Sequence, residues 1–132
     1  MPYKKQRQSV YDKYKGHCAY CGKQIAIKDM QIDHIIPQLN YEWIFKNKIL
    51  KMIPEFLNHL TENDVHHIDN LNSACRVCNK WKSTYHLELF RSEIQEQTKR
   101  LQLRSSNYRM AKLYGLVCES DVKVKFHFEN VM

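Results

Sequence analysis

The chain has 132 residues, with 21 Lys and Arg against 14 Asp and Glu, which gives a net charge of +7 at pH 7. This length suits one domain and is too short for two independent cores of ordinary size. No apolar run reaches the roughly 18 residues of a membrane span, and the N-terminus lacks the apolar core of a secretory signal. We therefore predict one domain over residues 1–132, located in the cytoplasm, with no membrane partner.

The positive charge is unevenly distributed along the chain. Residues 76–112 carry nine Lys or Arg against three Glu, and residues 1–16 are also basic, whereas residues 40–69 carry five acids against three Lys. Because a polyanion is attracted to clustered positive charge, the two basic segments are candidates for contact with nucleic acid. Solvated helix faces without a partner are the alternative.

The first predicted elements are a helix and a strand. Residues 8–15 have a helical pattern that ends at Gly16, which is able to adopt the left-handed conformation that closes a helix. Residues 30–36 alternate apolar side chains around Asp33 and His34 until Pro37 stops the run. This alternation predicts a strand.

The middle of the chain is predicted to be helical up to a second strand. Apolar residues recur at helical spacing over 41–60, but Pro54 interrupts them and therefore favours two short helices. Residues 71–74 predict a short strand. A helix is expected from about Asn79 to Leu103, with its apolar stripe on the buried side. The stripe consists of Leu87, Phe90, Ile94 and Leu101.

The C-terminal residues predict a further helix and a final strand. The helix covers 108–114 and is closed by Gly115, and the apolar residues of 122–128 alternate with polar ones. We thus predict an α+β fold with a core at 14–84. A helical insert at 40–68 interrupts this core, and a helical extension at 85–132 ends in a strand.

Two Cys-x-x-Cys pairs predict a metal site. Cys18 with Cys21, and Cys75 with Cys78, have the spacing by which one tight turn presents two thiolates to a tetrahedral ion. In a reducing compartment such pairs are more often metal ligands than disulfides, so we predict one structural zinc ion bound by all four. Disulfides or a redox pair are the alternatives. The fifth cysteine, Cys118, is expected to be only a small apolar residue.

Four polar residues lie close to these pairs in the sequence. Asp33 and His34 follow the first pair, and Asn70 and Asn79 flank the second. If zinc joins the two pairs, these residues converge, and the oxygens of Asp33 and Asn79 suit Mg²⁺ or Mn²⁺. On a regular strand, however, Asp33 and His34 point to opposite faces, so a shared site requires a bulge or a bridging phosphate.

The segments CAYCG, QIDHIIP and DNLNSACRVCNKWK together resemble the HNH endonucleases, over about residues 14–84. The resemblance implies a ββα-metal core formed by a strand hairpin and a helix around one metal ion. It also implies that His34 is the general base, that Asp33 and Asn79 hold the divalent ion, and that Asn70 fixes the active-site loop. Asn79 stands where the family name has a histidine, a familiar variant that can alter metal preference.

The resemblance further implies a hydrolase that cuts DNA phosphodiester bonds by attack of water, leaving a 5′-phosphate and a 3′-hydroxyl. Arg76 and Lys82 are expected to add phosphate contacts, although exposed charges without a special role are the alternative. His66 and His67, close to the motif, are further candidates for the site.

Other functions remain open at this level. A zinc-stabilised module that binds nucleic acid without cutting it fits the charge and the cysteines equally well. It has no need, however, for a carboxylate beside a phosphate that this carboxylate repels. A protein-interaction adaptor has only the helical insert in its favour. A homodimer would favour cleavage of both strands and a monomer would favour nicking.

Overall fold

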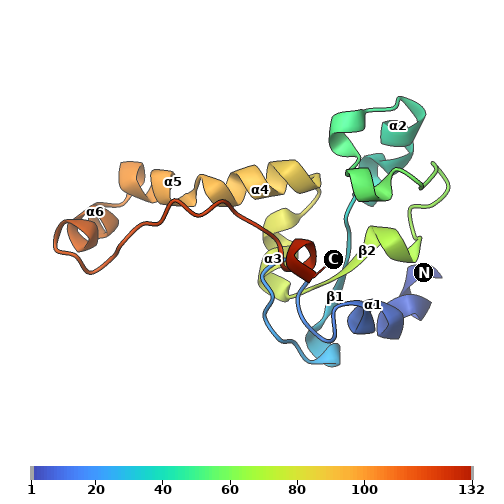
Figure 1. Cartoon of the computed structure of the whole chain (residues 1–132), viewed down its shortest axis with the longest axis horizontal. Helices are drawn as coiled ribbons and strands as arrows, with labels where there is room; N and C mark the ends of the chain where they lie inside the picture. The colour runs from blue at the N-terminus through green and yellow to red at the C-terminus, as the bar shows by residue number, and fades with distance from the viewer. Residues whose placement is uncertain (1, 132) are drawn as a thin grey trace.

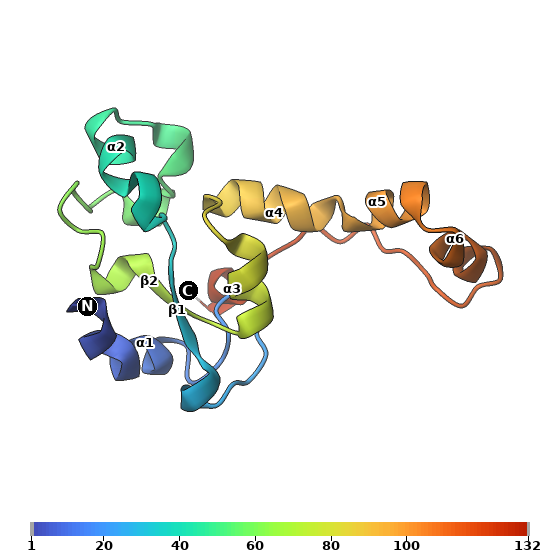
Figure 2. The ribbon, with the colours of Figure 1, turned by 180° about the vertical axis from the view of Figure 1, so that it is seen from behind.

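The computed structural model of the chain describes residues 2–131 and centres on an antiparallel hairpin. Its strands are β1 (Gln31–His34) and β2 (Leu71–Ala74), with Asp33 opposite Asn72 in the register. Helix α1 (Arg7–Lys13) packs against β2, and α3 (Arg76–Lys82) packs against β1 (Figure 2). The predicted α+β class is confirmed, with helices forming most of the regular structure.

The remaining helices follow the hairpin or interrupt it. They are α2 (Tyr41–Lys46), α4 (Leu87–Gln95), α5 (Gln97–Arg104), α6 (Ser106–Leu113) and α7 (His127–Val131). Six short 3₁₀ turns connect these elements within residues 2–131: Pro2–Gln6, Ile27–Asp29, Gln38–Asn40, Leu50–Met52, Glu55–Leu57 and Ile68–Asn70. No helix in this part of the chain is both long enough and apolar enough to cross a membrane.

The hairpin forms within the two segments that the sequence predicted as strands. All four residues of β2 are buried, and β2 coincides with the predicted strand at 71–74. Strand β1 covers residues 31–34 and is shorter than the predicted strand at 30–36. Beyond His34, Ile35 N still donates to the Asn70 carbonyl at 2.8 Å. Pro37, which has no N–H to donate, then ends the run.

Helix α1 ends at Lys13, earlier than predicted, and the chain then turns through Lys15 (φ +54°) and Gly16. The φ of Gly16 is +79°, and a Cβ at this position would lie 2.8 Å from the Tyr11 hydroxyl. A side chain here would be strained by the backbone conformation and would displace the Tyr11 hydroxyl. The chain turns here directly into the first cysteine pair.

The insert contains less α-helix than predicted. Only α2 is an α-helix, and the chain after it forms 3₁₀ turns, one of which starts directly after Pro54. Tyr41, Ile44 and Leu57 are buried and give the insert its own part of the core. The apolar spacing thus identified Ile44 and Leu57 as core residues, but Leu50 of the same pattern is 73% exposed, and the second helical element is only a 3₁₀ turn.

The prediction of one helix from Asn79 to Leu103 is wrong. Ser83 adopts φ +48°, which ends α3, and Glu96 separates α4 from α5. Helix α5 lies beyond α4 and extends away from the hairpin, so the apolar stripe does not stay against the core (Figure 1). Leu101 is consequently 43% exposed.

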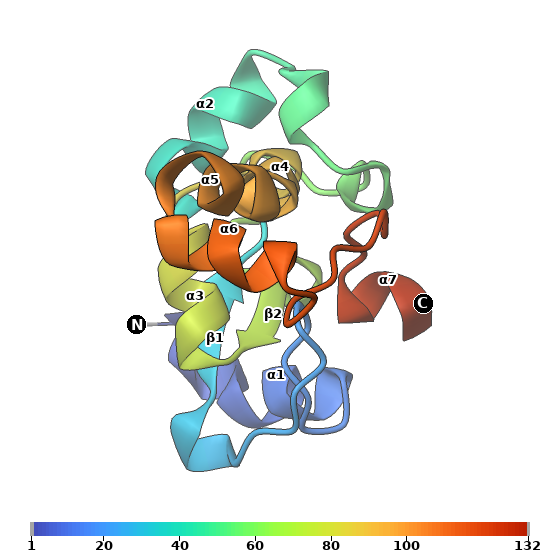
Figure 3. The ribbon, with the colours of Figure 1, turned by 90° about the vertical axis from the view of Figure 1, so that its left-hand side faces the viewer.

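Residues 97–121, which we call the C-terminal arm, project away from the hairpin (Figure 1). Figure 3 views this arm end-on, with α5 and α6 in front of the core. Helix α6 ends shortly before Gly115, whose φ of +73° agrees with the predicted closure. None of the residues in the arm is buried.

The predicted C-terminal strand at 122–128 is wrong, since the chain is extended without strand pairing and then forms α7. Side chains of α4 occupy the place of a partner strand. Gln95 bonds the backbone of Val122 and Val124, and Arg91 donates to the Val124 carbonyl at 2.8 Å. Of the alternating apolar residues only Phe126 and Phe128 are buried, and Phe128 already belongs to α7, whereas Val122 is 69% exposed, so the alternation does not mark one buried face.

Candidate metal centre and active site

The four paired cysteines meet at one point. Their sulfur atoms all lie within 4.8 Å of one another, and the Sγ atoms of Cys21 and Cys75 are 3.9 Å apart. Four thiolates bound to one tetrahedral zinc ion at about 2.3 Å lie about 3.8 Å from each other. The cluster therefore fits a structural zinc ion, with all four positions filled by protein.

Backbone hydrogen bonds hold the two Cys-x-x-Cys pairs, or knuckles, together. In the first knuckle, Gly22 N donates to the Cys18 carbonyl at 3.0 Å, and Ala19 N donates to the Ser73 carbonyl of β2 at 2.8 Å. The second knuckle starts at Cys75, which caps α3 by accepting from Cys78 N at 3.4 Å. Strand β2 thus connects both knuckles and fixes their separation.

None of the five cysteines forms a disulfide. A hydrogen bond between Cys18 and Cys78 lowers the pKa of the Cys18 thiol to about 4 and raises that of Cys78. Metal ions bind thiolates rather than thiols, so a readily deprotonated sulfur beside three others is suited to bind a metal ion. Cys118 lies apart and is exposed.

Asp33 is 4% exposed, and its charge is compensated inside the protein. Its carboxylate lies 3.2 Å from the Lys82 ammonium and also accepts a hydrogen bond from the Tyr20 hydroxyl. Burial raises the pKa of the Asp33 carboxyl, and Lys82 opposes that shift. A buried carboxylate of this kind requires such a partner.

The position of Lys82 changes the role that we assign to it. Its side chain is 0% exposed and donates to Asp33 and to the His34 carbonyl at 2.9 Å. The ammonium therefore does not reach the surface where a phosphate contact was predicted. Lys82 instead joins α3 to β1 through Asp33 and the His34 carbonyl.

Asn79 lies one turn before Lys82 on the same helix. Its Nδ2 donates to the Gln31 Oε1 at 2.6 Å, and Gln31 lies two residues before Asp33 on the same face of β1. Because the amide nitrogen faces Gln31, the amide oxygen is the group that Asn79 can offer to a ligand.

His34 contacts a different set of residues. It is 7% exposed, its Nε2 lies 3.0 Å from His66 Nδ1, and its ring packs edge-on against Tyr3. Burial lowers the pKa of His34 to about 4, and the charges of His66 and Lys82 act in the same direction. The imidazole is therefore neutral at pH 7.

Asp33, His34 and Asn79 border one hollow of about 200 Å³. The side chains of Asp33 and His34 have separate partners, as expected for neighbours on a regular strand, and no bulge interrupts the pairing of β1 with β2. The other lining residues are Ile32, Pro37, Gln38, Leu39, Ser83 and Thr84. The hollow thus combines an imidazole, a carboxylate and an amide.

Asn70 is buried and connects two loops. Its Oδ1 accepts from Ile36 N at 2.8 Å, and its Nδ2 donates to the carbonyls of Ile36 and Val65 at 3.2 and 2.9 Å. All of these contacts are to backbone groups. Asn70 therefore fixes the chain that follows His34 and does not itself border the hollow.

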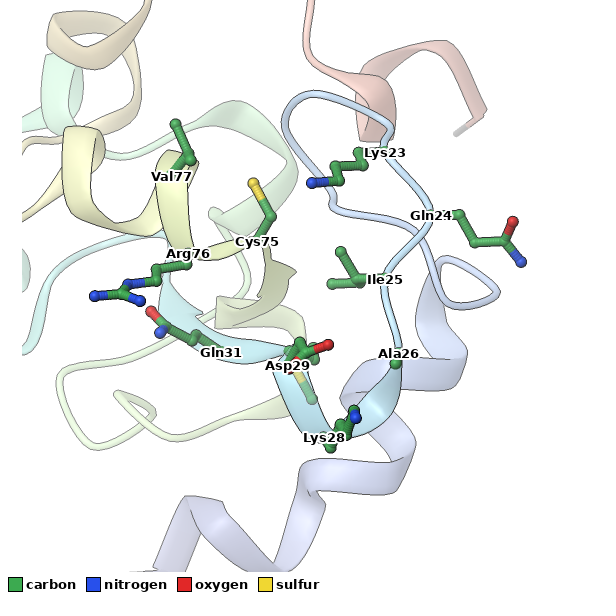
Figure 4. Close-up of a pocket in the computed structure, with 11 residues that line it drawn as sticks. Lys23, Gln24, Ile25, Ala26, Lys28, Asp29, Gln31, Cys75, Arg76 and Val77 are labelled. Carbon is green, nitrogen blue, oxygen red and sulfur yellow. The ribbon is translucent and has the colours of Figure 1, made fainter.

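Arg76 borders a second, larger pocket of about 450 Å³ beside the zinc cluster. Figure 4 shows Arg76 and Cys75 on one wall and Lys23 and Ile25 on the other. Arg76 is exposed, in contrast to Lys82. With Lys23 and Lys28 the pocket has three cations against Asp29, so a phosphate would find positive charge there.

Three residues near the hollow lie outside the predicted set: Tyr3, Gln31 and Tyr20. Tyr20 stands inside the first knuckle and Gln31 two residues before Asp33, so their places in the motifs were available as a signal. No sequence signal pointed to Tyr3, because its contact with His34 depends on the tertiary fold. His66 was a candidate by sequence proximity, and the structure brings it to His34.

Comparison of the chain with protein-family models, curated proteins and solved structures finds no significant match.

Proposed function

We propose that the chain is a metal-dependent endonuclease of the HNH type that hydrolyses DNA phosphodiester bonds. One observation carries the proposal: a neutral imidazole, a carboxylate and a side-chain amide border the same hollow beside a hairpin and helix. Hydrolysis of a phosphodiester needs a base for the water and oxygen ligands for a divalent ion, and this set supplies both.

His34 acts as the general base. An imidazole that is neutral at pH 7 has a free lone pair and is able to take the proton of a water molecule that attacks phosphorus. Because its pKa lies near 4, His34 remains unprotonated across the physiological range. The low pKa also makes it a weak base, so its position matters more than its basicity.

Asp33 and Asn79 would hold the divalent ion. Lys82 and Tyr20 occupy only part of the hydrogen-bonding capacity of the Asp33 carboxylate, which has about four lone-pair sites, and Asn79 can offer its amide oxygen. Such hard oxygen donors suit Mg²⁺ or Mn²⁺. When bound, the ion supplies neutralisation of charge on the scissile phosphate and on the leaving oxygen.

DNA is the proposed partner because of the charge pattern. The net charge is +7, and the pocket beside the zinc cluster gathers Arg76, Lys23 and Lys28. Binding to phosphates displaces counterions and weakens with salt. Arg76 keeps its proposed role as a phosphate contact, whereas Lys82 supports the site from inside.

Incubation of the purified zinc-loaded protein with supercoiled plasmid, in Mg²⁺, Mn²⁺ or EDTA, tests the proposal. We expect nicked or linear DNA with either metal and none with EDTA. Sealing of the nicks by DNA ligase without other treatment would indicate 5′-phosphate and 3′-hydroxyl ends. No cleavage with either metal, by protein that still binds the plasmid, would contradict the proposal.

A second candidate is a zinc-stabilised module that binds DNA without cutting it. The observation in its favour is the internal pairing of Asp33 with Lys82, because a carboxylate that already has a buried partner can be purely structural. The plasmid assay separates the two candidates, since the binding module shifts the mobility of the DNA without changing its topology.

A further inference from the structure

His34 and His66 form a contact that the proposed mechanism does not yet use. The two ring nitrogens are 3.0 Å apart, and the ring planes meet at 66° with centroids 5.2 Å apart. This is the geometry of one N–H···N hydrogen bond between imidazoles. His66 comes from the far end of the insert, 32 positions along the chain.

Several independent contacts hold His66 in this place. Gln6 Nε2 donates to the His66 carbonyl at 2.8 Å, and the Tyr3 ring lies 5.0 Å from the rings of both histidines. Asn70 donates to the carbonyl of Val65, the preceding residue, at 2.9 Å. The same Asn70 side chain bonds Ile36, two residues after His34, so one amide positions both partners.

The hydrogen bond decides which nitrogen of His34 remains free. Only one proton lies between Nε2 of His34 and Nδ1 of His66. If His66 donates, the neutral ring of His34 carries its own proton on Nδ1 and has no lone pair left for a water molecule. If His34 donates, its Nδ1 is unprotonated and is the basic atom of the ring.

We infer that His66 is a positioning residue for His34, which accepts the Nε2–H of His34 and thereby leaves His34 Nδ1 as the nitrogen that receives the proton from water. This inference rests on the proposed endonuclease activity for its consequence. The hydrogen bond itself concerns only the two histidines. It can therefore be tested without any cleavage assay.

Nitrogen NMR of the histidine rings in the zinc-loaded protein at neutral pH reads the tautomer directly. The signals of His34 are identified by their loss in His34→Gln. We expect a protonated Nε2 and an unprotonated Nδ1 in the wild type, and a mixture of tautomers in His66→Ala. A His34 that is protonated on Nδ1 in the wild type overturns the inference.

Plasmid cleavage by three variants supplies the second test. His66→Ala should lower kcat by about 10- to 100-fold, the usual cost of losing a supporting partner, with little change in KM. His66→Asn, whose amide oxygen can accept in place of Nδ1, should restore much of the rate. His59→Ala, an exposed histidine of the same insert, is the matched control and should cut like the wild type.

The two tests separate the inference from the proposed function. If the wild type cuts but His66→Ala cuts at the same rate, the positioning role is overturned and the endonuclease proposal stands. If the wild type does not cut, the endonuclease proposal fails, and the NMR result alone decides whether His66 sets the tautomer of His34. Equal tautomer populations in the wild type and His66→Ala overturn that role.

Discussion

The hairpin core and the C-terminal arm are both built from short elements, but different interactions hold them. In the core, β2 is wholly buried, four cysteines meet, and Asp33 pairs with Lys82 away from water. In the arm, no residue of 97–121 is buried, and surface ion pairs such as Lys112 with Glu119 join its segments. Exposed ion pairs contribute little to stability, so the free energy of folding resides in the core.

Loss of the zinc cluster should lower the stability of the core more than any of the other substitutions. Four thiolates form one closed site whose binding energy is also folding energy, so Cys75→Ser or a strong chelator should abolish cooperative unfolding of the core. Circular dichroism melting and elemental analysis measure this, with about one zinc per chain expected. Cys118→Ser, an exposed cysteine, is the control. Two disulfides in a zinc-free protein would contradict the site.

Lys82→Ala should lower the free energy of unfolding by about 3–5 kcal/mol, because it leaves the Asp33 carboxylate buried without an opposite charge. Lys80→Ala, on the exposed face of the same helix, should change it by less than about 0.5 kcal/mol. Urea denaturation of both variants measures the difference. Equal stabilities would mean that the ion pair is not formed.

The stability of Lys82→Ala should also depend on pH in a defined direction. Burial raises the pKa of Asp33, and removal of Lys82 takes away the group that opposes that shift. The folded variant then binds the proton more tightly than the unfolded chain, whose carboxyl titrates near about 3.9. Its stability should therefore fall as pH rises above about 4, and the deficit relative to the wild type should shrink in acid.

Residues 122–126, which lead from the arm back to the core, include both exposed and buried side chains. Phe126 is buried in the core, whereas Val122 is 69% exposed. Phe126→Ala should cost about 3–5 kcal/mol of stability, and Val122→Ala less than about 0.5 kcal/mol. Thermal melting of the two variants would show where the core ends. Similar losses would instead indicate that the returning segment is held along its whole length.

Arg76→Ala should have the smallest effect among these variants. Measured in EDTA, DNA affinity of the wild type should fall steeply with salt, and loss of one phosphate contact should reduce the slope of log K against log salt by about one unit. Stability should not change, because Arg76 is exposed. An unaltered slope would remove Arg76 from the interface.

The sequence predicted the core better than the arm for a physical reason. Cysteine spacing reports a local constraint, a tight turn that presents two thiolates to one ion, so the cluster was found. The strand predicted at 71–74 coincides with β2. Ser83 carries no signal for a positive φ, so the break after α3 was missed. At 122–128 the alternating pattern wrongly predicted a strand, because Val122 is exposed and the chain pairs with side chains of α4 instead of with a neighbouring strand.

The site was predictable in its residue types but not in their partners. Asp33, His34 and Asn79 border one hollow, but the burial of Lys82 could not be read from a charged residue in a basic segment. The contact of His34 with His66 joins positions far apart in the chain. Such pairings depend on how the insert folds back on the hairpin, and no local pattern encodes them.

Plasmid cleavage by His34→Ala tests the central claim most directly, because this change removes the proposed base and leaves the cysteines, Asp33 and Asn79 in place. His34→Gln serves as a second variant that keeps a polar group in the buried position. Zinc content and DNA binding in EDTA should match the wild type, while cleavage falls by about 10²- to 10⁴-fold. Cleavage by folded His34→Ala at the wild-type rate, in preparations where Cys75→Ser is inactive, would contradict the assignment of His34 as the base.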